Sequence, residues 1–481
     1  MSMIFNALSG AQAAQAALNT NSQNIANAMT PGYTRQGVLL NSIQPQAYGA
    51  NAAGGGVIVS SLLRFSDGYK SLQLWQSNSN LGQFNASQPY LTQLEQVMAD
   101  DTSNVNQGLD AFFAALNAAS VQPDSGPLRD QVLTAADGLV KRVASLQQLF
   151  NNQQAAIDAQ RGAVISQVNG FTHDIALLNK QIAAAQSTGI STSGLQDARD
   201  RKIDQLANLV GLQVVDQSDG SRSISLKNGQ PLVVGSDAAV MSLNGGALEL
   251  NFANGNFKVL ASNLGGQLGG LQDYQQQSLE PLRQSIRDLA QGIATSFNNT
   301  LAGTPAPPAA AYATFDLNGN NNPASKNLFA YSNGQLTLTG LKASELAFST
   351  TAGTGGDSGN LKKLIALKDH TIAITDFDAA GNKTVVSAGP PVVYQSTQLP
   401  IGDIYTQLVG KLGVQSQQNQ ASQNTSQTVR DQSEENWKST SGVNQDEEAI
   451  NLMQFKQMYE ANLKVVAVAN QLFDSTLAMV G

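Results

Sequence analysis

The first 36 residues read MSMIFNALSGAQAAQAALNTNSQNIANAMTPGYTRQ and contain no charged side chain before Arg35. Apolar residues recur along this stretch at heptad spacing and form one stripe: Ile4, Leu8, Ala11, Leu18 and Ile25. The spacing predicts a helix of about 25 residues. It should end at Thr30-Pro31-Gly32, because Pro31 disfavours helix before it and Gly32 can adopt a left-handed cap. Since an isolated helix of this kind is marginal in water, the sequence predicts a partner for it.

A second heptad helix is predicted at the other end of the chain. Asn444 and Glu447 have the spacing of a capping box, and the apolar stripe that follows comprises Leu452, Phe455, Tyr459, Leu463, Val466, Phe473 and Leu477. The two terminal stripes can pair as one coiled coil, within a subunit or between neighbouring copies. Alternatively, each helix packs on an unrelated core, and the residues alone leave both possibilities open.

Helical and strand-rich segments alternate between these ends. Helices are expected near residues 66–99, 105–119, 128–186, 195–209, 266–301 and 404–438, and strands within 33–64, 212–260 and 314–398. Pro89 should kink or divide the first of these helices. The charged run 199–202 is expected to be a solvated helix face.

The predicted fold is mainly α with an inserted β-domain. The N- and C-terminal helices would pair as a coiled coil, an elongated helical bundle would follow, and a β-rich outer domain would form from mid-chain insertions. The predicted domains are 1–36 plus 445–481 for the coiled coil, 37–211 plus 262–303 plus 399–444 for the bundle, and 212–261 plus 304–398 for the outer domain.

The amino-acid composition excludes some classes of function and disfavours others. The 481 residues carry a net charge of −8, which argues against a nucleic-acid partner, and no cysteine, which excludes thiolate chemistry and disulfides. Only 13% of residues are charged, which suits a surface covered by neighbours or reflects a bias in amino-acid usage. The start of the chain lacks the pattern of a cleaved secretory signal, and the sequence contains no apolar run long enough to cross a membrane. We expect no catalytic, cofactor or metal site.

Two motifs resemble a known family. Asn24-Ile25-Ala26-Asn27, followed by Pro31-Gly32-Tyr33, is similar to the N-terminal signature of flagellar rod, hook and hook-associated proteins. Gln23 and Met29 depart mildly from the common form of that signature. The run SGVNQDEEA at 441–449 is similar to the hook-associated members of this axial protein family.

The resemblance implies a structural subunit and no enzyme. Such a subunit would be an adaptor at the hook–filament junction, exported through the flagellar type III pathway and located outside the cell. Its partners would be copies of itself in a ring, the hook protein on the proximal side, a second hook-associated junction protein on the distal side, and an export chaperone at the C-terminal helix, with no nucleic acid or membrane. The alternatives are another flagellar axial protein, of the hook or distal rod, and a secreted adhesin.

Overall fold

The computed structural model describes residues 2–44, 54–101, 103–252, 255–259, 264–304, 310–322, 326–378, 381–387 and 393–480. Contacts between residues divide the chain into two compact units. Unit 1 comprises Met1–Gln83, Val164–Gly269 and Asn424–Gly481, and unit 2 comprises Phe84–Ala163 and Gly270–Gln423. Helices α2 (Gly68–Ala99), α4 (Gly126–Ser187), α6 (Gly266–Asp273) and α9 (Ile401–Ser441) contribute residues to both units.

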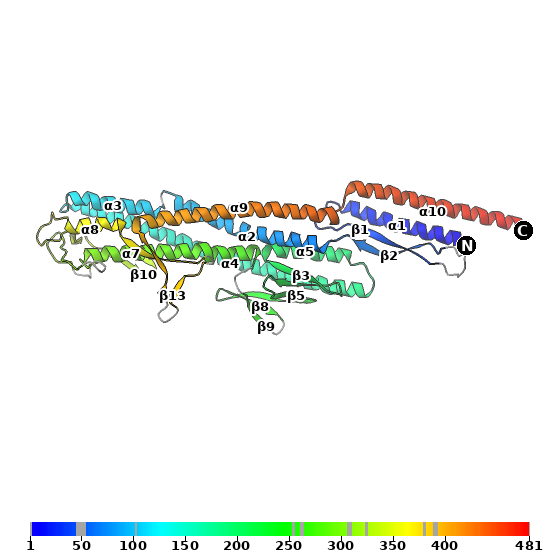
Figure 1. Ribbon diagram of the computed structural model, residues 1–481, viewed down its shortest axis with the longest axis horizontal. Helices are drawn as coiled ribbons and strands as arrows, with labels where there is room; N and C mark the ends of the chain where they lie inside the picture. The colour runs from blue at the N-terminus through cyan, green and yellow to red at the C-terminus, as the bar shows by residue number, and fades with distance from the viewer. Residues whose placement is uncertain are drawn as a thin grey trace. The chain divides into compact units, whose positions relative to one another are not determined.

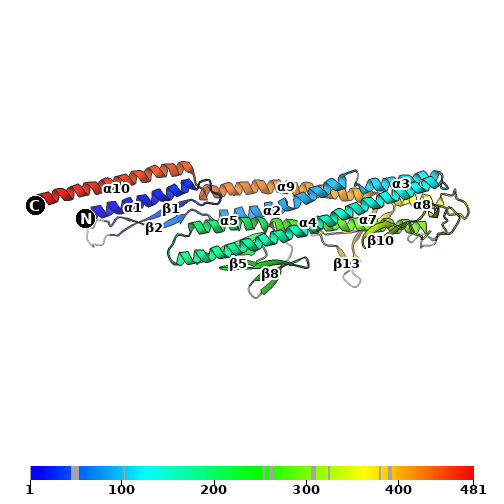
Figure 2. The same cartoon turned by 180° about the vertical axis from the view of Figure 1, so that it is seen from behind.

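The terminal helices lie side by side in unit 1. Helix α1 (Ser2–Ala26) runs antiparallel to α10 (Gln445–Val480), so that the two chain ends lie at the same end of the pair (Figure 1). Strands β1 (Gln36–Ser42) and β2 (Val57–Arg64) form an antiparallel hairpin along the other side of α1 (Figure 2). The predicted terminal helices, their pairing and the extended segment after α1 are therefore present, and Gly32 adopts the left-handed φ of +71° in the turn that follows α1.

The rest of unit 1 combines helices with two small antiparallel sheets. Helix α5 (Ser193–Leu209) leads into β3 (Leu212–Asp216), β4 (Arg222–Leu226), β5 (Pro231–Val234) and β6 (Asp237–Ala238), which pair in that order. Strands β7 (Val240–Asn244), β8 (Ala247–Phe252) and β9 (Gly255–Val259) form the second sheet. Apolar residues of α4, α5 and β4 are buried together in this unit because each presents one apolar face: Ile175, Ile182, Ile203, Leu206 and Ile224.

Unit 2 has an aromatic core. Phe112 of α3 (Val105–Val121), Phe297 of α7 (Glu280–Leu301) and Phe329 of β10 (Phe329–Ser332) pack with ring centroids 5.1–6.0 Å apart. Helix α6 (Gly266–Asp273) joins α7 through a π-helical turn, Tyr274–Leu279, and Pro281 directly follows this turn, in the first turn of α7. The remaining strands are β11 (Gln335–Leu338), β12 (Thr371–Thr375), β13 (Val385–Ser387), β14 (Val393–Tyr394) and β15 (Ser396–Pro400).

Three features differ from the sequence-based expectations. Helix α8 (Gly359–Ala366) lies in a segment where only strands were predicted. Helix α2 continues through Pro89 without being divided, and the side chains of Ser87 and Asn419 donate to the Phe84 carbonyl just before it. The two strand-rich segments, expected to share one outer domain, fall in different units. The three-domain division stays a prediction.

Candidate assembly interface

Helix α1 approaches its neighbours closely because its buried apolar residues are small. They are Ala7, Ala11, Ala13, Ala14 and Ala17. A Cβ added at Gly10 would lie 2.6 Å from the Asn462 side-chain oxygen of α10, so the helix pair leaves no room for a larger residue there unless Asn462 moves. Small residues on several faces allow α1 to contact α10 on one side and the hairpin on the other.

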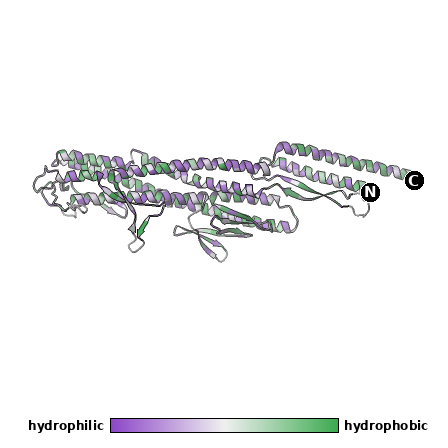
Figure 3. Ribbon diagram, in the orientation of Figure 1, coloured by the Kyte–Doolittle hydropathy of each residue, from purple (hydrophilic) through white to green (hydrophobic). Residues whose placement is uncertain are grey.

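Helix α10 presents a heptad seam to α1. Its half-buried and buried positions alternate in steps of four and three: Phe455, Tyr459, Asn462, Val466 and Ala469. Beyond Ala469, α10 continues past the start of α1 (Figures 1 and 2), and residues 470–479 are all exposed. Apolar residues continue along this overhang to the C-terminal end of α10 (Figure 3).

The predicted interface residues divide into two groups. Those that are buried or half-buried are Ile4, Ala11, Leu18, Phe455, Tyr459 and Val466. Those that are exposed are Leu8, Ile25, Leu452, Leu463, Phe473 and Leu477. The first group belongs to the packing of a single chain, whereas the second is open for contact with other molecules. The role of both groups in assembly stays a prediction.

A buried carboxylate joins the two sequence motifs where α1 ends and α10 begins. The Glu448 side chain is 2% exposed. It accepts hydrogen bonds from Asn21 Nδ2 at 2.6 Å, Asn24 Nδ2 at 3.1 Å and Arg35 Nε at 2.6 Å. Arg35 also donates through Nη1 to Glu447 at 3.1 Å and through its backbone N–H to the Ser441 carbonyl at 2.8 Å. We call this cluster of Asn21, Asn24, Arg35 and Glu448 the terminal latch.

Asn24 also fixes the turn that follows α1. Its Oδ1 accepts from the Tyr33 hydroxyl at 2.9 Å and from the Gln36 N–H at 3.0 Å, while its Nδ2 donates to the Gln36 carbonyl at 2.8 Å. Burial, together with the charges of Asp197 and Glu448, raises the pKa of Tyr33 to about 12. The other motif residues have simpler roles. Asn27, just after α1, donates to the Gln23 carbonyl, and Ile25 and Ala26 are exposed.

The start of α10 only partly follows the predicted capping box. Asn444 Oδ1 accepts from the backbone N–H groups of Asp446 at 3.0 Å and Glu447 at 3.4 Å, as expected for a helix cap. The Glu447 carboxylate forms an ion pair with Arg35 across the latch. The helix-end carboxylates therefore bind an arginine of the opposite chain terminus, a partner that sequence spacing did not reveal.

A second group of buried charges supports the hairpin. Arg64 at the end of β2 pairs with Asp197 at 2.8 Å and with Asp200 at 2.9 Å, both on α5. Asp200 also binds Arg222 of β4, and the Thr34 N–H donates to Asp197 at 3.2 Å. The prediction of a solvated face at 199–202 was therefore wrong for Arg199 and Asp200, because their partners come from distant segments.

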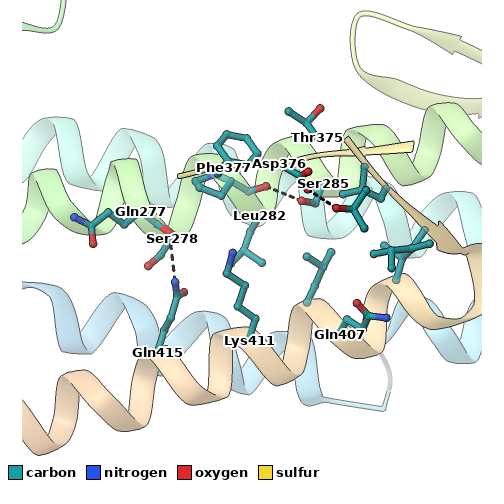
Figure 4. Close-up of a pocket in the computed structure, with 16 residues that line it drawn as sticks. Gln277, Ser278, Leu282, Ser285, Thr375, Asp376, Phe377, Gln407, Lys411 and Gln415 are labelled. Carbon is teal, nitrogen blue, oxygen red and sulfur yellow. Dashed lines mark hydrogen bonds between the residues drawn. The ribbon is translucent and has the colours of Figure 1, made fainter. Parts of the chain in front are cut away.

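A cavity of about 340 Å³ lies in unit 2 between α7, α9 and strands β12 and β15 (Figure 4). Leu282 and Ile404 contribute apolar walls, and Asp376 accepts a hydrogen bond from Thr397 at 2.8 Å. None of the residues predicted for the interface lines it.

The described residues form neither a metal-binding cluster nor a membrane-spanning helix. Among the described residues, no group of three or more histidine, aspartate or glutamate side chains is arranged to hold a metal ion. None of the described helices is both long enough and apolar enough to cross a membrane.

Comparison with family models relates three segments of the chain to flagellar proteins. Residues 91–304 match the model for the flagellar hook-associated protein FlgK helical domain. Residues 4–34 match that for flagella basal body rod proteins, and residues 439–479 match that for the C-terminal region of flagellar basal body rod FlgEFG proteins. The two rod-type matches include Asn21, Asn24 and Glu448 of the terminal latch, and Arg35 directly follows the N-terminal match. These matches define the class, which is that of the structural axial proteins of the bacterial flagellum.

The relatives that match over nearly the full length of the chain share one name. Flagellar hook-associated protein 1 of Escherichia coli (strain K12) is 27% identical over 99% of this chain and 99% of its own. That of Bacillus subtilis (strain 168) is 27% identical over 98% and 96%. The flagellar hook junction protein FlgK from Burkholderia pseudomallei shares the fold, with a TM-score of 0.55, 16% identity, and coverage of 75% of this chain and 98% of its own. Over almost its whole length the chain is therefore similar to flagellar hook-associated protein 1, a structural protein of the hook–filament junction.

Proposed function

We propose that this chain is an adaptor subunit at the hook–filament junction and that it assembles through its paired terminal helices. The observation that carries the proposal is the exposed overhang of α10. Leu472, Phe473, Leu477 and Met479 are exposed there, and Asp474 is the only charged residue after Lys464. An apolar helix end of this length in a water-soluble subunit is typical of a surface that another molecule covers.

The outer faces of the helix pair extend the same surface. Exposed apolar residues lie on α1 and on the first two-thirds of α10: Met3, Phe5, Leu8, Ile25, Ile450, Leu452, Met453, Met458 and Leu463. Burying such side chains contributes about 25 cal/mol per Å² of apolar area. Each copy can therefore gain stability by packing its terminal pair against its neighbours.

The family and the two predicted motifs support the choice of partners. We infer that copies form a ring, with the hook protein on the proximal side and a second hook-associated junction protein on the distal side. The chain would reach this extracellular position by flagellar export, and a chaperone would cover the exposed C-terminal helix beforehand. This role is structural and includes no catalysis.

A charge placed on the overhang tests the proposal. Phe473→Asp should leave the monomer folded, because Phe473 is 60% exposed, yet it should block filament growth by burying an unpaired charge between subunits. Val414→Asp is the matched control, since Val414 is 65% exposed on the long helix α9. Circular dichroism of the purified chains and filament counts on cells carrying each variant provide the measurements. Normal filaments with Phe473→Asp would contradict the proposal.

A further inference from the structure

A second cavity lies in unit 1, beside the turn that follows α1. It has a volume of about 500 Å³ and is bounded by that turn, α2, α5, the C-terminal part of α9 and the loop before α10. Both tryptophans of the chain, Trp75 and Trp437, line it, together with Met29, Leu74 and Val443. A cavity of this volume with aromatic side chains in its wall is of the kind that binds small organic molecules.

The three cationic side chains of the wall are already bound to oxygen acceptors. Arg201 of α5 donates through Nη1 to the Pro31 carbonyl at 3.3 Å. Arg430 and Lys438 of α9 both form ion pairs with Glu434, which lies between them on the same helix, and the pair with Lys438 measures 2.7 Å. The positive charges of the wall are therefore engaged within the subunit.

Asp204 of α5 forms no ion pair with a described residue, unlike the two other acidic residues of the wall. Asp200 is paired with Arg64, and Glu434 with the two cations of α9. Asp204 Oδ1 accepts from Asn78 Nδ2 at 3.1 Å, and no described residue donates to Oδ2. Burial raises the pKa of the Asp204 carboxyl group above its ordinary value. The cavity therefore contains a half-buried carboxylate that lacks a paired cation.

The tryptophans add a second feature that suits a positively charged ligand. The face of an indole ring attracts a cation, and tryptophan is the best of the aromatic side chains in this respect. One such contact exists at the cavity, since the Arg222 guanidinium lies 5.5 Å from the centroid of the Trp75 ring. Trp437 is half-buried in the wall, and no described side chain supplies its ring with such a cation.

We propose that this cavity binds a small organic cation whose alkylated ammonium group is held by the Asp204 carboxylate and the Trp437 ring. Such a group is weakly hydrated, so an aromatic and anionic wall can bind it at a low desolvation cost. A metal ion would need several oxygen ligands, and an anion would need a cation that is not already bound to an oxygen acceptor. The wall comes from one subunit, so the inference is independent of the proposed assembly.

Intrinsic fluorescence tests the proposal directly, because every tryptophan of the chain lines the cavity. Choline is the probe, and its control is the uncharged alcohol in which carbon replaces the choline nitrogen. Titration of the purified chain with choline should change the tryptophan emission until it saturates, whereas the alcohol should give no saturable change. Absence of a saturable change with choline would overturn the inference, as would an equal response to the alcohol.

Variants of the wall assign the binding to the cavity, with affinities measured by titration calorimetry and folding by circular dichroism. Asp204→Asn removes the charge but keeps the oxygen that accepts from Asn78, and it should weaken choline binding by about tenfold or more. Glu435→Gln is the matched control, because Glu435 is exposed on α9 and does not line the cavity; it should leave the affinity unchanged.

Trp437→Leu tests the aromatic wall independently of the carboxylate and should also weaken choline binding. Unchanged affinity in Asp204→Asn or in Trp437→Leu would overturn the inference. An equal loss of affinity in Glu435→Gln would overturn it too, because the effect would then come from the net charge of the chain and not from the cavity.

Discussion

Glu448 connects the two ends of the chain at the scale of a single residue. Its carboxylate is buried among Asn21, Asn24 and Arg35, so the charge is balanced by one cation and two amide donors. A buried charge is tolerated only when it is paired and hydrogen-bonded in this way. The latch therefore stabilises the helix pair as long as each of these groups is present.

Removing the charge of Glu448 should loosen the helix pair. Glu448→Gln leaves the half-buried Arg35 without its closest carboxylate, and we expect a loss of about 2–3 kcal/mol in the opening free energy of α1 and α10. Glu447→Gln is the matched control, because Glu447 binds the same arginine but is 57% exposed; it should change this free energy by less than about 1 kcal/mol. Hydrogen exchange of α10 amides measures both, and equal effects would contradict the assigned role of the latch.

Tyr33 should make the latch sensitive to high pH. Its pKa is raised from 10.0 to about 12 in the folded chain, so its contribution to stability is complete below pH 10 and is lost as the pH rises through 12. Tyr33→Phe should weaken the latch near pH 8, because the bond to Asn24 is gone, and should reduce the further loss between pH 10 and 12. Hydrogen exchange of α1 across this range would show it. An unchanged pH dependence in the variant would count against this prediction.

At the scale of the element, the close packing of α1 on its neighbours depends on small residues. Heptad spacing of large apolar residues does not identify them. The sequence predicted both terminal helices and the stripe that includes Phe455, Tyr459 and Val466. Apart from Ala11, it did not predict that the alanines of α1 would be its buried residues, because an analysis of apolar spacing gives most weight to large side chains. The latch was not predicted for a related reason. In the sequence Glu448 has the position of an ordinary helix-end charge, and only the fold places Asn21, Asn24 and Arg35 beside it.

Two glycines within helices illustrate this dependence on close packing. A Cβ at Gly82 of α2 would lie 2.2 Å from the Asn208 backbone carbonyl oxygen, whereas a Cβ at Gly170 of α4 would meet nothing within 4 Å. Gly82→Ala should therefore destabilise unit 1 by about 1–3 kcal/mol, and Gly170→Ala should stabilise it by about 0.5–1 kcal/mol. Urea unfolding followed by circular dichroism measures both changes. Stabilisation by both substitutions would contradict the close approach of α2 to α5.

At the scale of the whole molecule, the order of helices and strands could be predicted, but their grouping could not. The mainly helical fold, the long terminal helices and the strand-rich middle were expected and are confirmed. Helix α8 was missed because eight residues give too short a periodic signal beside a glycine-rich stretch. The placement of the two strand-rich segments in different units depends on contacts far apart in sequence, such as that of Asn169 with Met241, which periodicity does not reveal.

We propose that neighbouring subunits cover the apolar surface that the terminal helix pair leaves exposed. An image reconstruction of the hook–filament junction containing this chain tests it most directly. We predict that Leu472, Phe473 and Leu477 lie buried against adjacent copies, while the contact between α1 and α10 is kept within each subunit. A reconstruction in which these three side chains face solvent would contradict the claim.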